Sequence, residues 1–261
     1  MKSWKVIVYL TLCISTGVGS VSFAASSTDV EIHFESSPQR HLTYNHRPRL
    51  DEVVLQALNK TDADRRKIDW FTSGIYDINV ELKLKQQVFG VIAKQQAIAS
   101  KRYHGSWFYW SQLRNSLESL HYAKRIFHTI DPDATRLSLP LNPKLTGNWL
   151  MTLKYTPKDV LVLGGVTKPG KQTWQPRLDA GSYAQTAGLF DNTISKVTVI
   201  QPDGKVEQHQ TGYWNYSFSE IAPGAIVYVP LPVEELPVIY PNDRLQNPND
   251  LVVELLRNRL P

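Results

Sequence analysis

The sequence predicts an α+β fold, in which short strands and amphipathic helices follow one another along the chain. Three observations predict it: period-two alternation at 30–34, helical apolar spacing at 50–58 and between 78 and 127, and the return of short strands between 160 and 231. The 261 residues, 42% hydrophobic and 20% charged, suffice for one large or two small cores. We therefore expect a folded protein.

The N-terminus has the pattern of a secretory signal peptide at residues 1–24. Lys2 and Lys5 precede an apolar run at 6–14, which fades through small residues toward Ala24. We expect cleavage after Ala24. The alternative is a retained membrane anchor, but the run is shorter than the ~20 apolar residues that span a bilayer, and Ser, Thr and Gly interrupt it.

Cysteine usage and charge argue against a disulfide-stabilised chain and against a nucleic-acid-binding protein. Cys13 is the only cysteine and lies in the predicted signal, so the mature chain has no internal disulfide. Without Lys2 and Lys5, the 29 basic residues fall to 27 against 24 acidic ones, a formal charge of +3. The basic residues are scattered, apart from 62–67 and 101–102, which we expect to be solvated. We predict no nucleic-acid partner.

The first elements predict a small α+β unit. Residues 30–34 and 42–44 can pair as strands across the polar turn 35–40. The next segment, 50–58, reads as a helix with Leu50, Val54 and Leu58 on one side.

Two amphipathic stretches joined by a polar turn at 100–105 predict an antiparallel helical hairpin. Trp107 and Trp110 could stack on sugar rings, but aromatic residues at periodic helical positions are more often core. The first predicted stripe is Ile78, Leu82, Phe89, Ala93 and Ala97, and the second is Trp107, Trp110, Leu113, Leu117, Leu120 and Phe127.

The second half of the chain predicts a sheet folded around one helix. Strands are expected at 150–155 and 160–166, 171–175, 197–207 as a hairpin and 225–231, with a helix at 180–187. Proline and glycine in the Pro202-Asp203-Gly204 turn fit a tight reversal. This order of elements, two strands, a helix and further strands that return against it, is typical of a β-grasp sheet. The polar break 156–159 is the preferred domain boundary.

The glycine-rich stretch VLVLGGVTKPG at 160–170 needs no nucleotide to explain it. Glycines allow sharp turns and close packing of the backbone. The stretch lacks the lysine-hydroxyl pair of a P-loop and the spaced glycines of a dinucleotide site. We predict no cofactor.

The last residues predict an amphipathic helix. Asn247 can cap it, with Pro248 in the first helical position and Asp250 in the first turn. Leu251, Leu255, Leu256 and Leu260 repeat at helical spacing. Docking on its own domain is the favoured interpretation, and an exposed helix for a membrane or a partner is the alternative.

No catalytic or metal-binding pattern stands out. The seven histidines have no zinc-site spacing, and no Gly-x-Ser-x-Gly occurs. Asp131 and Asp133 flank Pro132, and capping or a turn explains them better than a glycosidase pair. We predict no catalytic residues and no metal, with a polysaccharide-modifying enzyme as the less favoured alternative.

An ordered set of motifs resembles the GfcC-like (YjbG-like) family, which is encoded with capsule and exopolysaccharide secretion systems. The resemblance implies two β-grasp domains, a helical hairpin inserted in the first, a C-terminal amphipathic helix and a periplasmic location. The motifs, after a signal peptide, are DWFTSG (69–74), LTGNW (145–149), LGGVTKPGKQTW (163–174), QPDG (201–204), GYWN (212–215), PG (223–224) and RLP (259–261).

With this resemblance, the expected domains are a signal peptide at 1–24, a first β-grasp domain at 25–157 with a hairpin insertion at about 76–130, a second β-grasp domain at 158–235, and a connector with the amphipathic helix at 236–261. The resemblance implies a non-catalytic accessory role in capsule or exopolysaccharide assembly or export. The implied partners are an anionic or neutral surface polysaccharide and an outer-membrane export channel or sibling lipoprotein. Membrane contact is expected only through the C-terminal helix, and a pure protein-interaction module is the alternative function.

In this family a cleft between the domains and the hairpin carries an arginine just after the second hairpin helix, in a Thr-Gly-Arg context. Thr135-Arg136 lies closest to that motif here, so the resemblance assigns the place to Arg136. A guanidinium recognises carboxylate or phosphate groups in two-pronged fashion. Tyr213, Trp214 and Asn215 could stack a sugar and bond its hydroxyls, and Trp70 is a further candidate. For each tryptophan, packing in a core is the alternative.

Overall fold

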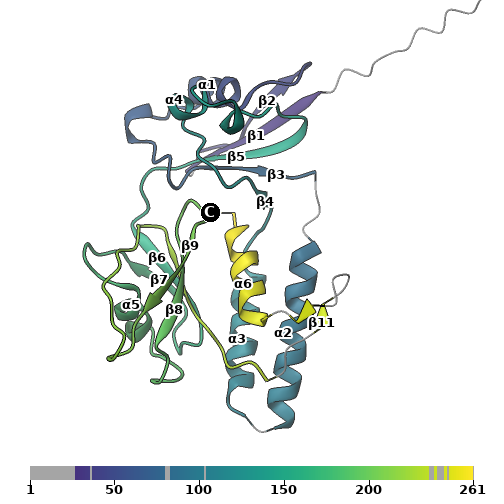
Figure 1. Ribbon diagram of the computed structural model, residues 1–261. Helices are drawn as coiled ribbons and strands as arrows, with labels where there is room; N and C mark the ends of the chain where they lie inside the picture. Colours follow the sequence, from purple (N-terminus) through teal and green to yellow (C-terminus); the bar gives the residue numbers. More distant parts are fainter. Residues whose placement is uncertain are drawn as a thin grey trace, which may run out of the picture.

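The computed structural model describes residues 27–35, 37–79, 83–102, 104–234, 238–239, 244–245 and 247–260. The predicted signal peptide, Leu82 of the first predicted stripe and most of the predicted connector lie outside these residues. An α+β fold is confirmed, with two five-stranded sheets. Figure 1 shows one sheet in the upper unit and the other beside a group of helices in the lower unit.

The first sheet has the strand order β2-β1-β5-β3-β4. Only β1 and β5 run parallel, and the other neighbours are antiparallel. Helix α1, Leu50–Lys60, packs on one face, where Leu50, Val54 and Leu58 are buried as predicted. The strands are β1 (Thr28–Phe34), β2 (Arg40–Tyr44), β3 (Gly74–Asp77), β4 (Lys124–Arg125) and β5 (Gly147–Leu153).

The second sheet repeats this arrangement in the order β7-β6-β10-β8-β9. Again only the first and last strands along the chain, β6 and β10, run parallel. Helix α5, Ala180–Thr186, lies between its second and third strands in sequence, as α1 does in the first sheet. The strands are β6 (Asp159–Gly164), β7 (Gly170–Thr173), β8 (Lys196–Ile200), β9 (Val206–Gln210) and β10 (Ile226–Val229).

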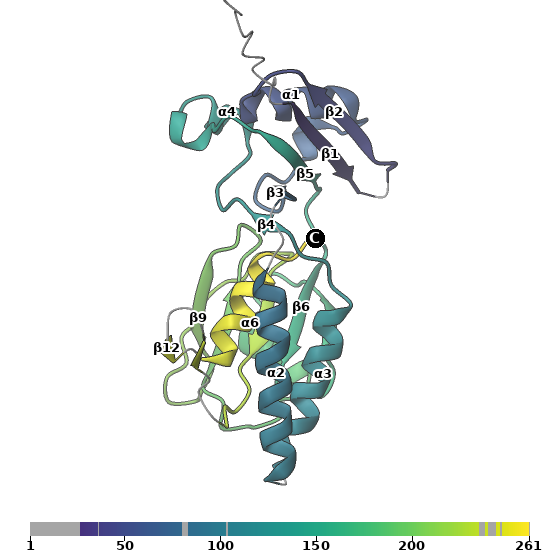
Figure 2. The same ribbon diagram turned by 90° about the vertical axis from the view of Figure 1, so that its right-hand side faces the viewer.

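Both faces of the second sheet are covered, because side chains alternate along each strand. Val227 and Val229 of β10 pack toward α5. Ile226 and Tyr228 pack on the opposite face against three helices, α2 (Lys83–Lys101), α3 (Ser106–Glu118) and α6 (Pro248–Arg257). The views in Figures 1 and 2 agree that these helices lie side by side below the first sheet.

The helical hairpin α2–α3 therefore packs away from the sheet that it interrupts. It lies between β3 and β4 in the sequence, yet its apolar side chains join the core of the second sheet. The remaining short elements are η1 (Arg65–Lys67), α4 (Pro132–Thr135), η2 (Leu139–Leu141), β11 (Val238–Ile239) and β12 (Arg244–Leu245).

The predicted apolar stripes of the hairpin are partly wrong. Along α2, Ile78 lies before the helix and Ala97 is exposed. In α3, Trp110, Leu113 and Leu117 are buried as predicted, but Trp107 is 44% exposed. The buried side chains of α2 are Val88, Val91, Ile92, Gln95 and Ala99.

Helix α3 also ends earlier than predicted, at Glu118, so Leu120 and Phe127 are not part of it. The chain that follows bonds to the end of α6 instead. Ala123 N donates to Asn258 O at 3.1 Å, and Leu260 N donates to His121 O at 2.8 Å. These long-range backbone bonds replace the helical ones that would continue α3.

Helix α6 begins as predicted, with Asn247 Oδ1 accepting from Asn249 N at 2.9 Å. Its apolar side chains, Leu251, Val252, Val253, Leu255 and Leu256, are all buried against the sheet and hairpin. The helix thus docks on its own chain, the favoured interpretation. In the part of the chain that the structure describes, no helix combines the length and apolarity needed to cross a bilayer.

The glycines at 164 and 204 have the structural roles expected of them. Gly164 has φ +98°, and a Cβ there would collide with the carbonyl oxygen of Val229 on β10. Gly204 has φ +89° and closes the predicted turn, donating to Gln201 O at 2.8 Å. Both positions favour glycine because other residues rarely adopt such backbone angles.

A buried asparagine fastens α6 to the second sheet. Asn249 Oδ1 accepts from Tyr228 Oη at 2.7 Å and from Leu231 N at 2.9 Å, and its Nδ2 donates to Leu231 O at 2.9 Å. All of these bonds are buried. Burial raises the pKa of Tyr228 well above its usual value, so this hydroxyl stays protonated as a donor.

We predict that Asn249→Ala lowers the free energy of unfolding by roughly 2–4 kcal/mol, because buried donors left without acceptors each cost about 1–3 kcal/mol. Urea denaturation followed by circular dichroism measures the change. Asn115→Ala, at an exposed position of α3, is the matched control and should stay within ~0.5 kcal/mol. Equal stability of the two variants would contradict the anchoring role.

Candidate functional site

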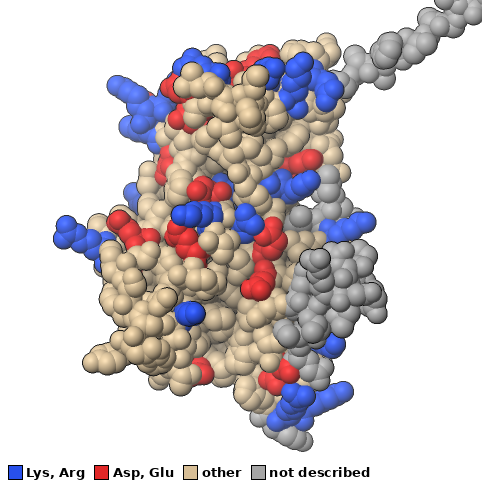
Figure 3. All heavy atoms as spheres, in the orientation of Figure 1, with Lys and Arg blue, Asp and Glu red and all other residues tan. Residues whose placement is uncertain are grey.

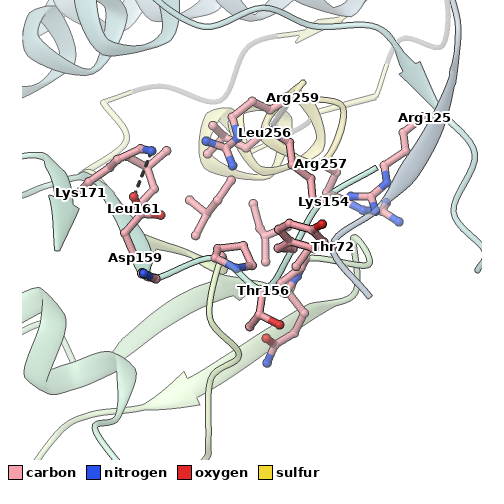
Figure 4. A pocket seen from close by; sticks show the side chains of 18 of the residues that line it. Thr72, Arg125, Lys154, Thr156, Asp159, Leu161, Lys171, Leu256, Arg257 and Arg259 are labelled. Carbon is pink, nitrogen blue, oxygen red and sulfur yellow. Dashed lines mark ion pairs between the residues drawn. The ribbon is translucent and has the colours of Figure 1, made fainter. Parts of the chain in front are cut away.

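A cavity of about 440 Å³ lies where the two sheets and the end of α6 meet. Figure 4 shows side chains from α6, from β4 and from the β5–β6 connection around it. The C-terminal end of α6 lies between the two units in Figures 1 and 2. The cavity therefore lies between the predicted domains, where the family resemblance led us to expect a cleft.

Positive charge dominates the lining. Figure 3 shows charged side chains gathered across the middle of one face, at the level where the two units meet. Among the described residues of the lining, Glu35 and Asp159 are the two acidic ones. The six basic residues are Arg125, Lys154, Lys158, Lys171, Arg257 and Arg259.

Two of the six cations are paired with carboxylates. Lys171 Nζ lies 3.0 Å from Asp159 Oδ2, and Arg257 Nη1 lies 2.6 Å from Glu254 Oε2. Among the residues that the structure describes, Arg125, Lys154, Lys158 and Arg259 form no ion pair with a carboxylate. Excess positive charge in a partly enclosed site attracts anions.

Backbone pairing places Arg125 and Arg259 on the same cavity. The strand-like segment 121–125 runs antiparallel to 258–260, with a bridge between Tyr122 and Arg259. Arg125 N also donates to Asn258 Oδ1 at 3.0 Å. The two arginines come from distant parts of the sequence, but this pairing fixes their register.

Arg125 has an unused hydrogen-bond donor. Within the described part of the chain, its Nε is buried without a hydrogen-bond partner, and its Nη2 makes only a long contact of 3.5 Å to Ser73 O. The guanidinium carbon lies 5.8 Å from the centre of the Tyr76 ring. A Cβ on Gly74 would lie 3.3 Å from Arg125 Nε. Because glycine has no side chain, the guanidinium fits beside it. An acceptor from a ligand would satisfy this donor.

Burial lowers the pKa of the Arg259 guanidinium below its usual value, and Arg125 lowers it further. The nearby groups Tyr76, Tyr122 and Asp159 oppose this shift. Removing a charge from water is costly unless an opposite charge compensates it. A bound anion would supply that compensation.

Arg257 connects the cavity to the turn of the second sheet. Its Nε donates to Gly204 O at 2.9 Å, and its guanidinium carbon lies 4.1 Å from the centre of the Phe127 ring. Phe127 itself packs on Gly204. These contacts and the ion pair with Glu254 give Arg257 a mainly structural role.

Arg136, the predicted cleft arginine, does not line the cavity. It follows α4, is exposed, and pairs with Asp133. Figure 2 shows α4 on the outer side of the first unit, away from the end of α6. Trp70 is partly buried against the core of the first sheet and is also absent from the cavity lining.

The other predicted site residues lie together in a different place. Tyr213 and Trp214 are exposed on the loop after β9, so neither closes a core. Asn215 holds this loop, with Nδ2 donating to Ser195 O at 3.2 Å. The structure thus brings Tyr213, Trp214 and Asn215 together but separates them from Arg136 and Trp70.

Arg125 was not predicted, because the expected second helix ran to Phe127 and so contained it, and Arg136 was chosen for its Thr-Arg context. With α3 ending at Glu118, an arginine just after the second hairpin helix is Arg125. Arg259 was part of the terminal RLP motif, but no local pattern indicated that it faces a cavity. The available signal was the pair Lys124-Arg125 following the last buried leucine of α3.

The fold and site define a two-unit α+β protein with a cationic cavity between its units. Among the described residues, no cluster of three or more histidine, cysteine or acidic side chains could hold a metal ion. Comparison with known families matches residues 168–261 to the family "Capsule biosynthesis GfcC C-terminal".

A curated relative supports the same assignment. The chain is 33% identical over 120 residues to "Uncharacterized protein YjbG" of Escherichia coli (strain K12). The match covers 46% of this chain and spans about half, 49%, of the length of that relative. The predicted resemblance to GfcC-like (YjbG-like) proteins is thus confirmed over the matched parts of the chain.

We predict that inorganic phosphate stabilises the protein by binding in the cavity. At a tenfold excess over Kd, one bound anion adds about 1.4 kcal/mol to the free energy of unfolding. Thermal unfolding at constant ionic strength measures the gain, and Arg125→Gln should reduce it. Phosphate also stabilises proteins without binding, so Arg65→Gln, at an exposed position of η1, is the control. The same gain in both variants would contradict anion binding at Arg125.

Proposed function

We propose that the protein is a periplasmic, non-catalytic accessory factor in capsule or exopolysaccharide assembly or export, and that it binds acidic groups of the polymer in the cavity between its sheets. The observation that carries the proposal is the lining of six basic and two acidic residues. Membership of residues 168–261 in a capsule biosynthesis family supports the biological setting. The periplasmic location rests on the predicted signal peptide.

We also propose that each unit is a β-grasp domain, with the boundary near residue 157. Both sheets place the last strand in the centre, parallel to the first strand and antiparallel to the third. Each carries one helix between its second and third strands. The hairpin α2–α3 is then an insertion in the first domain, used to cover the second.

The chemistry of the cavity favours carboxylate or phosphate substituents. Arginine presents several donors in a plane, which match the paired oxygens of these groups. Lys154 and Lys158 add charge from the connection between the sheets. The volume of about 440 Å³ lies within the range of small-molecule sites. A single acidic sugar unit with its neighbours is a fitting occupant.

The two carboxylates of the cavity support a non-catalytic role. Glu35 Oε1 accepts from Tyr155 N at 2.8 Å, and Asp159 is paired with Lys171. A general acid must be free to reach the leaving group of its substrate, whereas both carboxylates are already held by groups of the fold. Neither carboxylate is placed for acid catalysis.

Calorimetric titration with acidic oligosaccharides from the host's surface polysaccharide tests the proposal. We expect Arg259→Gln to weaken binding at least tenfold, about 1.4 kcal/mol, because it removes a charge that the ligand compensates. Arg136→Ala is the matched control and should bind like the unaltered protein, since Arg136 lies outside the cavity. Carboxyl-reduced oligosaccharides should not compete.

Three results would overturn this proposal. Hydrolysis or transfer of the glycan by the purified protein would contradict the non-catalytic role. Equal binding of acidic and carboxyl-reduced oligosaccharides would contradict recognition of charge. A loss of affinity in Arg136→Ala but not in Arg259→Gln would move the site to α4. Circular dichroism checks folding, and Arg125→Gln replaces Arg259→Gln if that variant unfolds.

Docking to an outer-membrane export channel or a sibling lipoprotein is the second candidate function. The observation that favours it is the apolar loop around η2, where Leu137 is 86% and Leu139 is 73% exposed. Exposed apolar patches commonly mark protein contacts. Two results together would favour this function over the first. The protein should co-purify with the channel but lose this interaction in the double variant Leu137→Ser, Leu139→Ser, and it should bind no glycan.

A further inference from the structure

The loop after β9 carries a second concentration of aromatic side chains. Tyr213 is fully exposed and Trp214 is 74% exposed, and Tyr216 and Phe218 follow with more than half of their surface in solvent. Four exposed aromatic residues within six positions have no role in the core. Exposed apolar side chains gathered in one place commonly mark a binding surface.

The loop is held in place at both sides of Tyr213 and Trp214. Asn215 N donates to Gly212 O at 3.1 Å, and Asn215 Nδ2 donates to Ser195 O at 3.2 Å. Tyr216 Oη donates to Asp179 Oδ2 at 2.7 Å, and the same aspartate caps α5. Burial acts to raise the pKa of Asp179, but the hydrogen bonds from Tyr216 and Ser182 outweigh it and hold this pKa below its usual value, so the acceptor stays charged. The two outward rings are thus presented by an anchored loop.

A cavity of about 210 Å³ lies beside these rings and above α5. Tyr213 and Trp214 form one side, and the side chains of Gln185, Asn192 and Thr211 contribute polar groups. Among the described residues, these three polar side chains form no hydrogen bond. They are therefore available to a ligand as donors and acceptors.

None of the described residues that line this second cavity is charged. Figure 3 shows few charged atoms over the part of this face where Figure 1 places α5. An acidic ligand would find no counter-charge here, and an apolar peptide would leave the three polar side chains unsatisfied. A neutral, polar ligand with flat apolar faces fits both properties. Sugar rings have that combination, because their C–H faces pack on aromatic rings while their hydroxyls bond to amides and hydroxyls.

We infer that the loop 211–218 and α5 form a second binding site, for a neutral saccharide. Tyr213 and Trp214 stack on sugar rings, and Gln185, Asn192 and Thr211 bond to hydroxyl groups. Asn215 acts as an anchor of the loop rather than as a ligand group. The site shares no residue with the cationic cavity, so its test does not depend on whether the proposed function is correct.

Titration with neutral oligosaccharides of glucose, galactose and mannose, followed by tryptophan fluorescence and calorimetry, tests the inference. We expect saturable binding of at least one sugar type and a loss of affinity of tenfold or more in Trp214→Ala. Gln185→Ala should weaken binding as well, since it removes a hydrogen-bonding partner without altering the aromatic surface. Trp107→Ala, which removes another exposed tryptophan on α3, is the matched control and should bind normally.

The outcomes separate this site from the first one. Arg259→Gln should leave neutral-sugar binding unchanged, and Trp214→Ala should leave phosphate binding unchanged. No binding of any neutral oligosaccharide at millimolar concentration would overturn the inference. So would equal loss in Trp107→Ala and Trp214→Ala, or binding that survives both Trp214→Ala and Gln185→Ala. Displacement of the sugar by an apolar peptide would show that the loop is a protein-docking surface instead.

Discussion

The second sheet has one face that packs against α2, α3 and α6, and the burial of this face determines how the protein is assembled. That face presents Leu163, Ile200, Ile226 and Tyr228, which a lone five-stranded sheet would expose to water. The covering helices come from outside the sheet: α2 and α3 from an insertion in the first unit, and α6 from the end of the chain. Because apolar burial drives this packing, the two units are joined by a shared core rather than by a linker alone.

The cationic cavity is a consequence of that assembly. As α6 packs on the second sheet, its last turn meets the segment that leaves α3, and the backbone bonds of 121–125 with 258–260 fix both. Arg125 and Arg259 are thereby held close to Lys154 and Lys158 at the junction. Like charges in a partly enclosed site repel one another. A bound anion would offset this repulsion among the four cations, which explains why the fold gathers them at one site.

The sequence predicted the local elements well, because each had a local cause. The hairpin at 30–44, the helix at 50–58 and the turn at Gly204 were found where alternation, helical spacing and turn chemistry placed them. The cap of α6 at Asn247 was also correct. Two strands, β3 and β4, were missed, because they are short and pair only with residues far away in the sequence.

The candidate site was less predictable for the same physical reason. The end of α3 at Glu118 is set by bonds to residues near 258, which no window around α3 contains. Arg125 therefore fell inside the expected helix, and the Thr-Arg pair at 135–136 indicated Arg136 instead. Tyr213 and Trp214 were predicted as candidate sugar contacts, with core packing as the alternative. Their exposure and the uncharged cavity beside them depend on α5, which lies about 30 residues earlier in the chain.

The central claim is that an acidic ligand completes the unused donors of the cavity, and nuclear magnetic resonance of arginine side chains tests it most directly. The Nε–H signal of Arg125 should shift and exchange more slowly with water when an acidic oligosaccharide is added, because Nε gains an acceptor. The signal of Arg65, exposed on η1, should stay unchanged. Saturable binding of the oligosaccharide with no change at Arg125 or Arg259 would contradict the account.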